Sequence, residues 1–399
     1  MAAVIIFLAV YLVLTVGRLP GFRVDRPGAC IIGASLMIAF GVLDFSQAYA
    51  AINYDTIILL FGVMIVVANL RLSGFFGAVA EWVVEHAHRP LALLASIVFV
   101  AGFFSAFFVN DTMCLVLTPL VLEITRHLRR NPVPYLLAVA MAANIGSVAT
   151  ITGNPQNMMI GSFSGIHYRT FAAALSPVAA VGLLLTIAVI FAAYRREFRF
   201  QEKVDLDRRP VRINRVLLWK SLAVSAGMIA AFFVGWPVAK VALLAGALLL
   251  VTRRVNPEKI YREIDWSLLV LFIGLFIVVA GVEKTSLPED LFRLTQRFHL
   301  ERIAVLSTFA ALLSNIVSNV PAVLVFKPFI AHMRDPVRAW LTLAMSTTLA
   351  GNLTILGSVA NLIVVQRARH EAPISFWEYC RVGVPLTVLT IAAGVLFLR

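Results

Sequence analysis

Two stretches with the same pattern decide the fold: Ser105–Pro119, SAFFVNDTMCLVLTP, and Ser314–Pro328, SNIVSNVPAVLVFKP. A shift of 209 positions places Asn110 on Asn319 and aligns the first and last residues of the two stretches. Each copy interrupts a very apolar run with a polar break that contains this Asn. Backbone groups freed by such a break are expensive in a membrane unless protein or water satisfies them. Two equivalent breaks therefore predict a solute site.

The composition surrounding these stretches is that of a polytopic membrane protein. The 399 residues are 60% hydrophobic and 14% charged, whereas soluble domains are about 45–50% apolar and about 25% charged. The net charge of +13 comes from Lys and Arg in short loops between apolar runs. This pattern is typical of cytoplasmic loops and not of a nucleic-acid surface. The three cysteines (Cys30, Cys114 and Cys380) are too far apart to indicate a disulfide framework or a metal site.

Membrane spans are expected wherever an apolar run approaches about 20 residues. These runs are 2–17, 28–44, 55–72, 90–109, 133–152, 171–194, 216–234, 237–252, 266–283, 301–318, 337–356 and 382–398. Two shorter apolar pieces, 111–126 and 320–333, follow the Asn breaks and fit re-entrant hairpins better than spans. Residues 74–89 are expected to form an interfacial amphipathic helix.

The two halves of the chain repeat one another. Phe61–Leu70, FGVMIVVANL, matches Ile273–Val282, IGLFIVVAGV, at a shift of 212, and GNPQN at 153–157 matches GSVAN at 357–361 at a shift of 204. The basic loop after the first span places the N-terminus outside under the positive-inside rule. The counterpart of the first span, 216–234, then runs in the opposite direction. The sequence therefore predicts inverted repeats, an architecture of secondary transporters.

The expected fold is an all-α polytopic membrane protein with two inverted-topology repeats, each with ordinary spans, one re-entrant hairpin and one broken helix. The expected segments are a first repeat at 1–194 (hairpin about 105–128, broken helix about 133–165), a basic cytoplasmic linker at 195–215, and a second repeat at 216–399 (hairpin about 314–333, broken helix about 337–366). The expected location is a bacterial inner membrane, with multiple passes and both termini periplasmic.

The breaks carry the residue types that a solute site requires. Half-helices that start at a break direct their N-terminal amides at a bound solute, and freed carbonyls can bind a cation. The Asn amide suits both tasks because it donates and accepts hydrogen bonds. The alternative is that these polar residues only cap helix ends or join helices. The symmetry of four breaks favours a site.

Asp111 is the most informative single residue, because an Asp at membrane depth is expensive and usually marks an ion or proton pathway. It is predicted to carry the coupling proton or to help bind the coupling cation. The alternative is that it caps the hairpin tip by accepting backbone amides. The second tip has Val320 at the equivalent position, and Lys327 replaces Thr118. Coupling is therefore expected where the two halves differ.

Several of these motifs resemble a known family. ANIGSVATITGNPQNMMIG (143–161), GNLTILGSVANLIVV (351–365) and the tips VNDT and SNVP are similar to the paired motifs of the ion transporter superfamily, in particular its ArsB/NhaD-type, citrate-transporter-like bacterial permeases. The resemblance covers residues from about 28 to 398. It implies a scaffold domain and a mobile transport domain with elevator-type motion, and it leaves a homodimer open. The site residues that it implies are Asn110, Asp111, Thr112, Asn154, Asn157, Asn319, Ser358 and Asn361.

The expected function is secondary active transport of a small inorganic ion or oxyanion, as in arsenite permeases, coupled to H⁺ or Na⁺. The alternatives are a Na⁺/H⁺ antiporter, a dicarboxylate or citrate carrier, and a channel. Dicarboxylate carriers of this superfamily have Ser-Asn-Thr at both tips, which this chain lacks. No set of nucleophile, base and metal ligands is clustered in the sequence, so neither enzyme activity nor a cofactor or resident metal is expected. The expected partners are the solute and the lipid bilayer, and a separate ATPase partner is left open.

Overall fold

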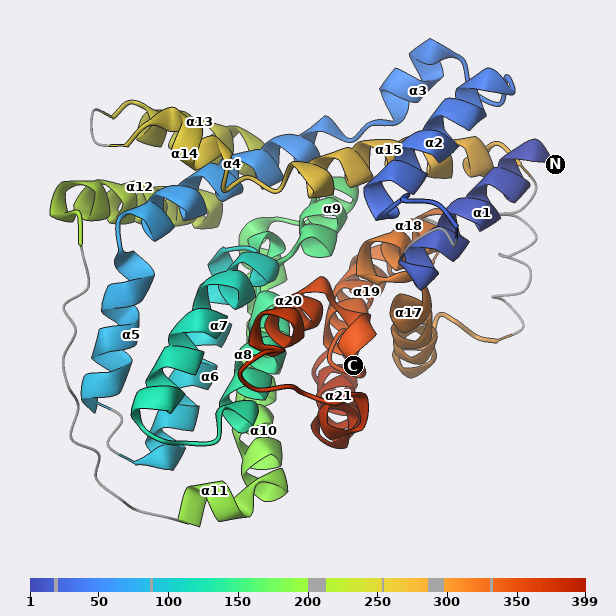
Figure 1. The fold of residues 1–399 in the computed structure, drawn as a ribbon. Helices are drawn as coiled ribbons and strands as arrows, with labels where there is room; N and C mark the ends of the chain where they lie inside the picture. Colours follow the sequence, from blue (N-terminus) through green and yellow to red (C-terminus); the bar gives the residue numbers. More distant parts are fainter. Residues whose placement is uncertain (18–20, 87–88, 200–212, 253–254, 286–297, 331–332) are drawn as a thin grey trace.

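The computed structural model describes residues 1–399 except 18–20, 87–88, 200–212, 253–254, 286–297 and 331–332 (Figure 1). All regular structure in the described residues is helical. The first half contains α1 (Ala2–Val16), α2 (Arg26–Ala39), α3 (Phe45–Ala51), α4 (Tyr54–Leu72), α5 (Phe75–His86), α6 (Pro90–Phe107), α7 (Asn110–His127), α8 (Pro132–Ser147), the 3₁₀ turn η1 (Ile151–Gly153), α9 (Pro155–Ser164), α10 (Tyr168–Ala193) and α11 (Arg195–Arg199).

The second half follows a similar order. It contains α12 (Arg215–Val234), α13 (Val238–Leu250), α14 (Pro257–Tyr261), α15 (Trp266–Glu283), α17 (Ile303–Val317), α18 (Asn319–Ile330), α19 (Pro336–Ala350), the 3₁₀ turn η2 (Ile355–Gly357), α20 (Val359–Ala368) and α21 (Phe376–Phe397). Each predicted span corresponds to one of these helices, and the predicted interfacial segment corresponds to α5. Most of the predicted linker at 195–215 lies outside the described residues.

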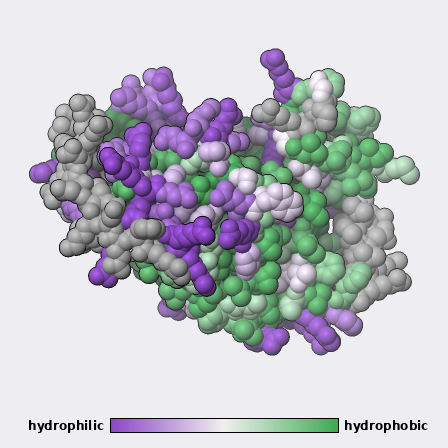
Figure 2. Space-filling model, turned by 60° about the horizontal axis from the view of Figure 1, so that its bottom comes forward, coloured by the Kyte–Doolittle hydropathy of each residue, from purple (hydrophilic) through white to green (hydrophobic). Residues whose placement is uncertain are grey.

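The helices form a multi-span membrane protein. Among the described helices, α4, α6, α10, α12, α15 and α21 are long and apolar enough to cross a membrane. Large apolar side chains are exposed along outward faces, where a lipid environment would cover them. Examples are Leu8, Leu12, Trp219, Leu244, Leu248 and Leu396. Figure 2 shows apolar residues gathered over a broad part of one face, with hydrophilic residues beside them.

Two long helices, α4 and α15, meet near the centre of one edge of the molecule and together run across it (top of Figure 1). Helices α12, α13 and α14 lie at one end of this pair, and α1, α2 and α3 lie at the other end. The hairpins and broken helices lie below the pair, around α8 and α19.

Close helix contacts hold α4 against α13 and α15 against α2. A β-carbon at Gly62 in α4 would lie 2.5 Å from the carbonyl carbon of Ala242 in α13. A β-carbon at Gly274 in α15 would lie 2.6 Å from the carbonyl carbon of Cys30 in α2. The same shift of 212 positions relates the two glycines to each other and the two partners to each other. Only glycine permits both of these approaches.

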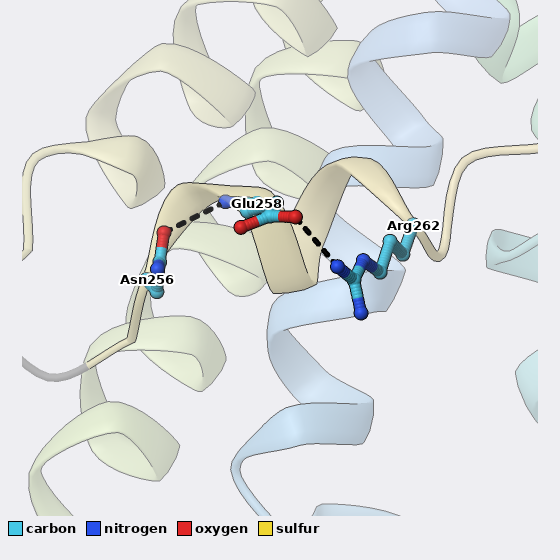
Figure 3. Close-up of polar contacts among 3 residues, drawn as sticks. All are labelled: Asn256, Glu258 and Arg262. Carbon is cyan, nitrogen blue, oxygen red and sulfur yellow. Dashed lines mark hydrogen bonds and ion pairs between the residues drawn. The ribbon is translucent and has the colours of Figure 1, made fainter.

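A short capped helix closes the connection between α13 and α15 (Figure 3). The Asn256 side chain accepts a hydrogen bond from the Glu258 amide at 3.0 Å, and Glu258 pairs with Arg262 at 2.6 Å. Both partners of that ion pair are exposed, so the pair adds little stability. A second ion pair, between Arg71 and Glu263, joins the end of α4 to the residues that follow α14. These contacts hold the connection against the long helix.

The first hairpin starts earlier than the sequence predicted. Only Phe108 and Val109 separate α6 from α7, and the two helices pack against each other. The predicted ordinary span at 90–109 is therefore the first arm of the hairpin, and α7 is a second arm of equal length, 18 residues. In the second half, Ser318 alone separates α17 from α18. The broken helices, α8–η1–α9 and α19–η2–α20, lie within a few residues of their predicted bounds.

Candidate functional site

A cavity of about 80 Å³ lies between the two hairpin tips and the helices α1, α2 and α15. Helices α1 and α15 close it with Leu14, Leu268 and Leu271. Its polar lining comes from Arg26, Asn110, Asp111, Gln156, Ser318, Asn319 and Ser358. The cavity thus combines side chains from both halves of the chain.

Four helices of the hairpins and broken helices begin at this cavity. Asn110 starts α7, Pro155 starts α9, Asn319 starts α18 and Val359 starts α20, and all four residues line it. The N-terminus of a helix carries roughly half a positive elementary charge and several unpaired N–H groups. Four such ends directed at one small volume favour a solute with electron-rich oxygen atoms.

Asn144, in the last turn of α8, links the two halves behind the cavity. Its side-chain oxygen accepts from Asn110 Nδ2 at 2.8 Å and from Ser358 Oγ at 3.1 Å. Its side-chain nitrogen donates to Asn352 Oδ1 at 2.8 Å and to Asn361 Oδ1 at 3.0 Å. All five residues are buried. One amide therefore positions two residues that line the cavity and both Asn residues of the second broken helix.

The two broken helices satisfy their freed carbonyls in the same way. Asn157 Nδ2 donates to the carbonyls of Ser147 and Thr150, each at 3.0 Å. Asn361 Nδ2 donates to the carbonyls of Gly351 at 2.6 Å and Thr354 at 3.1 Å. A shift of 204 positions relates every member of the first set to its counterpart in the second. The side chains of these two Asn residues thus satisfy backbone carbonyls, and the two residues do not belong to the described lining of the cavity.

The residues that start the half-helices follow the same shift. Asn154 Oδ1 accepts from the Asn157 amide at 2.8 Å and caps α9. Ser358 Oγ accepts from the Ala360 amide at 3.2 Å and caps α20. Asn154 also donates to Thr348 Oγ1 at 3.2 Å. Both caps are consistent with the local preference of Asn and Ser for this position.

The second hairpin tip is tied to both broken helices. When the Asn319 amide is oriented to satisfy its neighbours, its nitrogen donates to the carbonyls of Gly357 at 3.1 Å and Thr347 at 3.2 Å. Its oxygen then accepts from Gln156 Nε2 at 3.2 Å. Ser318, just before it, has φ of +79° and ψ of +160°. This region is essentially restricted to glycine, and such strain in other residues concentrates at functional sites.

The first tip differs at two polar atoms. Asn110 is 3% exposed, and its Oδ1 has no hydrogen-bond partner among the described residues. Asp111 is half-buried, lines the cavity and faces the backbone amide of Ala360 at the start of α20. The N-cap residue of α7 is Val109, and no side chain caps that helix. The Asp111 carboxylate is thus directed at the cavity, and Val320 faces the same cavity from the equivalent position.

Seven of the eight predicted site residues therefore fall into two groups. Asn110, Asp111, Asn319 and Ser358 line the cavity. Asn154, Asn157 and Asn361 lie behind it and hold the breaks, and Thr112 belongs to the first turn of α7 without lining the cavity.

Three residues with clear roles in the site were not predicted, namely Arg26, Asn144 and Gln156. The sequence placed Arg26 among loop charges and gave no signal for its position. Asn144 could have been found as a polar residue in an otherwise apolar stretch of α8.

Lys327 lies away from the cavity lining. Its ammonium group pairs with Glu283 of α15 at 3.0 Å and lies 4.9 Å from the ring centroid of Phe163. Both charged side chains are about one-third exposed, 35% and 34%. Lys327, which replaces the Thr118 of the first hairpin, thus forms an ion pair between the second hairpin and α15.

Comparisons with known proteins found similar membrane transporters. The CitMHS family model, described as a citrate transporter, matches residues 9–339. The chain is 30% identical to the silicon efflux transporter LSI3 of Oryza sativa subsp. japonica over 94% of this chain and 93% of that protein. It is 31% identical to an uncharacterized transporter of Mycobacterium tuberculosis over 99% and 97%, and 24% identical to the putative transporter arsB of Dictyostelium discoideum over 93% and 87%. The crystal structure of the Alcanivorax borkumensis YdaH transporter has a similar fold, with a TM-score of 0.64 and 14% identity over 100% of this chain and 98% of that one.

Proposed function

Since the chain belongs to the CitMHS family of membrane transporters, we propose that it is a secondary active carrier of a small inorganic ion or oxyanion. The observation that carries this proposal is the convergence of four helix N-termini on a cavity of about 80 Å³. The positive ends of these helices favour oxygen-rich solutes. The amide and hydroxyl groups of Asn110, Asn319 and Ser358 supply donors and acceptors for the same atoms.

The size of the cavity separates the solute classes. In a cavity, one water molecule needs about 10–15 Å³ of accessible volume, so 80 Å³ has room for about five to eight water-sized groups. Pockets for drug-sized organic molecules span about 300–1,000 Å³. A tricarboxylate such as citrate is far larger than this cavity, whereas an arsenite- or silicate-sized solute matches it. The names of the rice and Dictyostelium relatives point to the same size class.

Transport would require two groups of helices that move relative to each other, a scaffold and a transport domain. The two halves would be inverted repeats, as the shifts of 204 and 212 positions between equivalent contacts support. Helices α1–α4 and α12–α15 would form a scaffold, and the hairpins with the broken helices would form the transport domain. Elevator-type motion of that domain would carry the cavity across a bacterial inner membrane, with both termini periplasmic and a homodimer as the assembly.

Asp111 would couple transport to H⁺ or Na⁺. It is the one acidic side chain that the described part of the chain contributes to the lining of the cavity, and an acid at membrane depth usually takes part in ion or proton movement. Its presence also favours the second candidate, a Na⁺/H⁺ antiporter. In that case the carboxylate would bind the cation directly. The four positive helix ends oppose this arrangement, so the oxyanion carrier is the first choice.

Transport assays in everted membrane vesicles separate the two candidates. Vesicles with the protein should accumulate arsenite or silicic acid in a manner that depends on the proton or sodium gradient, and vesicles without it should not. Proton release on addition of sodium or lithium, with no response to either oxyacid, would instead establish the antiporter. Uptake of citrate with no uptake of the small solutes would contradict the argument from cavity size.

A further inference from the structure

Arg26 is placed unusually for a residue of a basic loop. It is the first residue of α2, directly after the α1–α2 connection, and its side chain lines the cavity between the hairpin tips. Its Nε atom is buried and has no hydrogen-bond partner among the described residues. The adjacent Asp25 caps the same helix, and its carboxylate accepts a hydrogen bond from the Gly28 amide at 3.0 Å. A guanidinium group held in this way lacks a partner for at least one of its donors.

The cavity contains one side chain of each charge. Among the described residues, Arg26 is the only basic residue in its lining and Asp111 is the only acidic one. They come from different groups of helices, α2 and the first hairpin. Removing a charge from water is expensive unless an opposite charge or hydrogen bonds compensate for it. The negative charge of Asp265 acts on Asp111 from a distance. Asp265 is exposed at the start of α15 and caps that helix, so it does not occupy the cavity.

We propose that Arg26 is a specificity-determining residue that binds a solute oxygen, and that Asp111 is its counter-charge when the cavity is empty. This inference rests on the proposed function. The planar guanidinium presents paired N–H donors that match two oxygens of an oxyacid. Asn110, which lines the same cavity, has a buried Oδ1 without a donor among the described residues. The preferred solute is therefore a small oxyacid that presents at least one acceptor oxygen and at least one hydroxyl group.

The inference distinguishes solutes that are otherwise of similar size. Arsenite and silicic acid retain hydroxyl groups and satisfy both Arg26 and Asn110. Sulfate offers acceptors to Arg26 but has no hydroxyl to donate to Asn110 or to the Asp111 carboxylate. A lone cation satisfies neither Arg26 nor the helix N-termini. The expected order of preference is thus oxyacids with hydroxyl groups before sulfate, and sulfate before sodium.

The test compares Arg26→Gln and Arg26→Lys with Arg23→Gln, which removes an exposed charge from the same connection. Vesicle uptake of arsenite and silicic acid gives KM and kcat, with sulfate as competitor. Loss of a charge-assisted hydrogen bond should raise KM about tenfold to a hundredfold in Arg26→Gln. Arg26→Lys should lie between it and the wild type, and Arg23→Gln should leave KM unchanged.

A second measurement covers variants that fold poorly. Purified Arg26→Gln should unfold at a lower temperature than the wild type, because it leaves Asp111 without a counter-charge. The double variant Arg26→Gln/Asp111→Asn should recover most of this loss. Additive losses in the double variant would overturn the assignment of Asp111 as the counter-charge.

The remaining outcomes of the uptake assay test the role of Arg26, the proposed function and the requirement for a hydroxyl group. Unchanged KM for the oxyacids in Arg26→Gln, with wild-type uptake intact, overturns the role of Arg26 and leaves the proposed function standing. If the wild type itself transports neither oxyacid, both the proposed function and this inference fail. Competition by sulfate as strong as that between the two oxyacids overturns the requirement for a hydroxyl group.

Discussion

Replacing Asn144 with Ala should destabilise the protein more than any other single amide substitution near the cavity. The change removes four buried hydrogen bonds, to Asn110, Ser358, Asn352 and Asn361. Interhelical hydrogen bonds in membrane proteins contribute about 0.6 kcal/mol on average, and those in soluble proteins contribute up to about 1.5 kcal/mol. The expected loss in the free energy of unfolding is therefore about 2–6 kcal/mol.

SDS-induced unfolding of the purified protein in detergent measures this loss. Asn131→Ala is a matched control, because Asn131 caps the same helix with one exposed bond to the Val133 amide at 3.0 Å. That variant should lose about 1 kcal/mol. The Asn144 variant should also transport poorly, because two of the partners that it leaves unpaired, Asn110 and Ser358, line the cavity. A loss for Asn144→Ala no larger than that for Asn131→Ala would refute the reasoning that this amide connects the two halves.

Three further substitutions test separate parts of the argument. Asp111→Asn should abolish gradient-driven transport while expression stays intact; if transport and its pH dependence survive, Asp111 is not the coupling residue. Asn110→Ala and Asn319→Ala should each raise the KM for the solute about three- to tenfold, the effect of one lost hydrogen bond, and unchanged KM in both variants would leave the site unsupported. Gly62→Val should lower the free energy of unfolding by about 1–3 kcal/mol by separating α4 from α13, whereas Gly227→Val, where a β-carbon meets open space, should change it little.

The helices could be predicted because their signals are local. The predicted span at 266–283 coincides with α15 (Trp266–Glu283), and the predicted span at 55–72 differs from α4 (Tyr54–Leu72) by one residue at its start. In a membrane protein the length of an apolar run and the polar residues that end it are set by the bilayer and by helix capping. These are properties of neighbouring residues, so a single sequence contains them.

The cavity could be predicted only in part because its lining depends on which helices meet. Asn110 and Asn319 were recognisable from the repeat, since both interrupt apolar runs at equivalent positions. Arg26 was not, because a basic residue after a first span fits the positive-inside rule whether or not it faces a cavity. The division between Ser358, which lines the cavity, and Asn361, which holds the backbone, follows from three residues of helix rotation. The sequence marks both residues as polar and does not assign these roles.

The strain at Ser318 gives a prediction of unusual sign. Its φ of +79° with ψ of +160° lies in a region that costs a residue with a β-carbon about 1–3 kcal/mol. Ser318→Gly removes this cost, but glycine also increases the entropy of the unfolded chain, which lowers the stability by about 0.4–1 kcal/mol. The variant should therefore be more stable than the wild type by about 1 kcal/mol. Val109, at the equivalent position of the first tip, has an ordinary φ of −52°, so Val109→Gly should destabilise the protein.

The functional effect of Ser318→Gly should be opposite to its effect on stability. Strain persists at a site only where the surrounding structure imposes it, and here it fixes the direction in which Asn319 enters α18. A glycine at this position lets the tip relax, so the KM for the solute should rise as stability rises. Ser318→Ala retains the β-carbon and the strain, and it should leave both quantities near the wild-type values. Equal stability of Ser318→Gly and Ser318→Ala in SDS unfolding would contradict the view that the tip is held under strain.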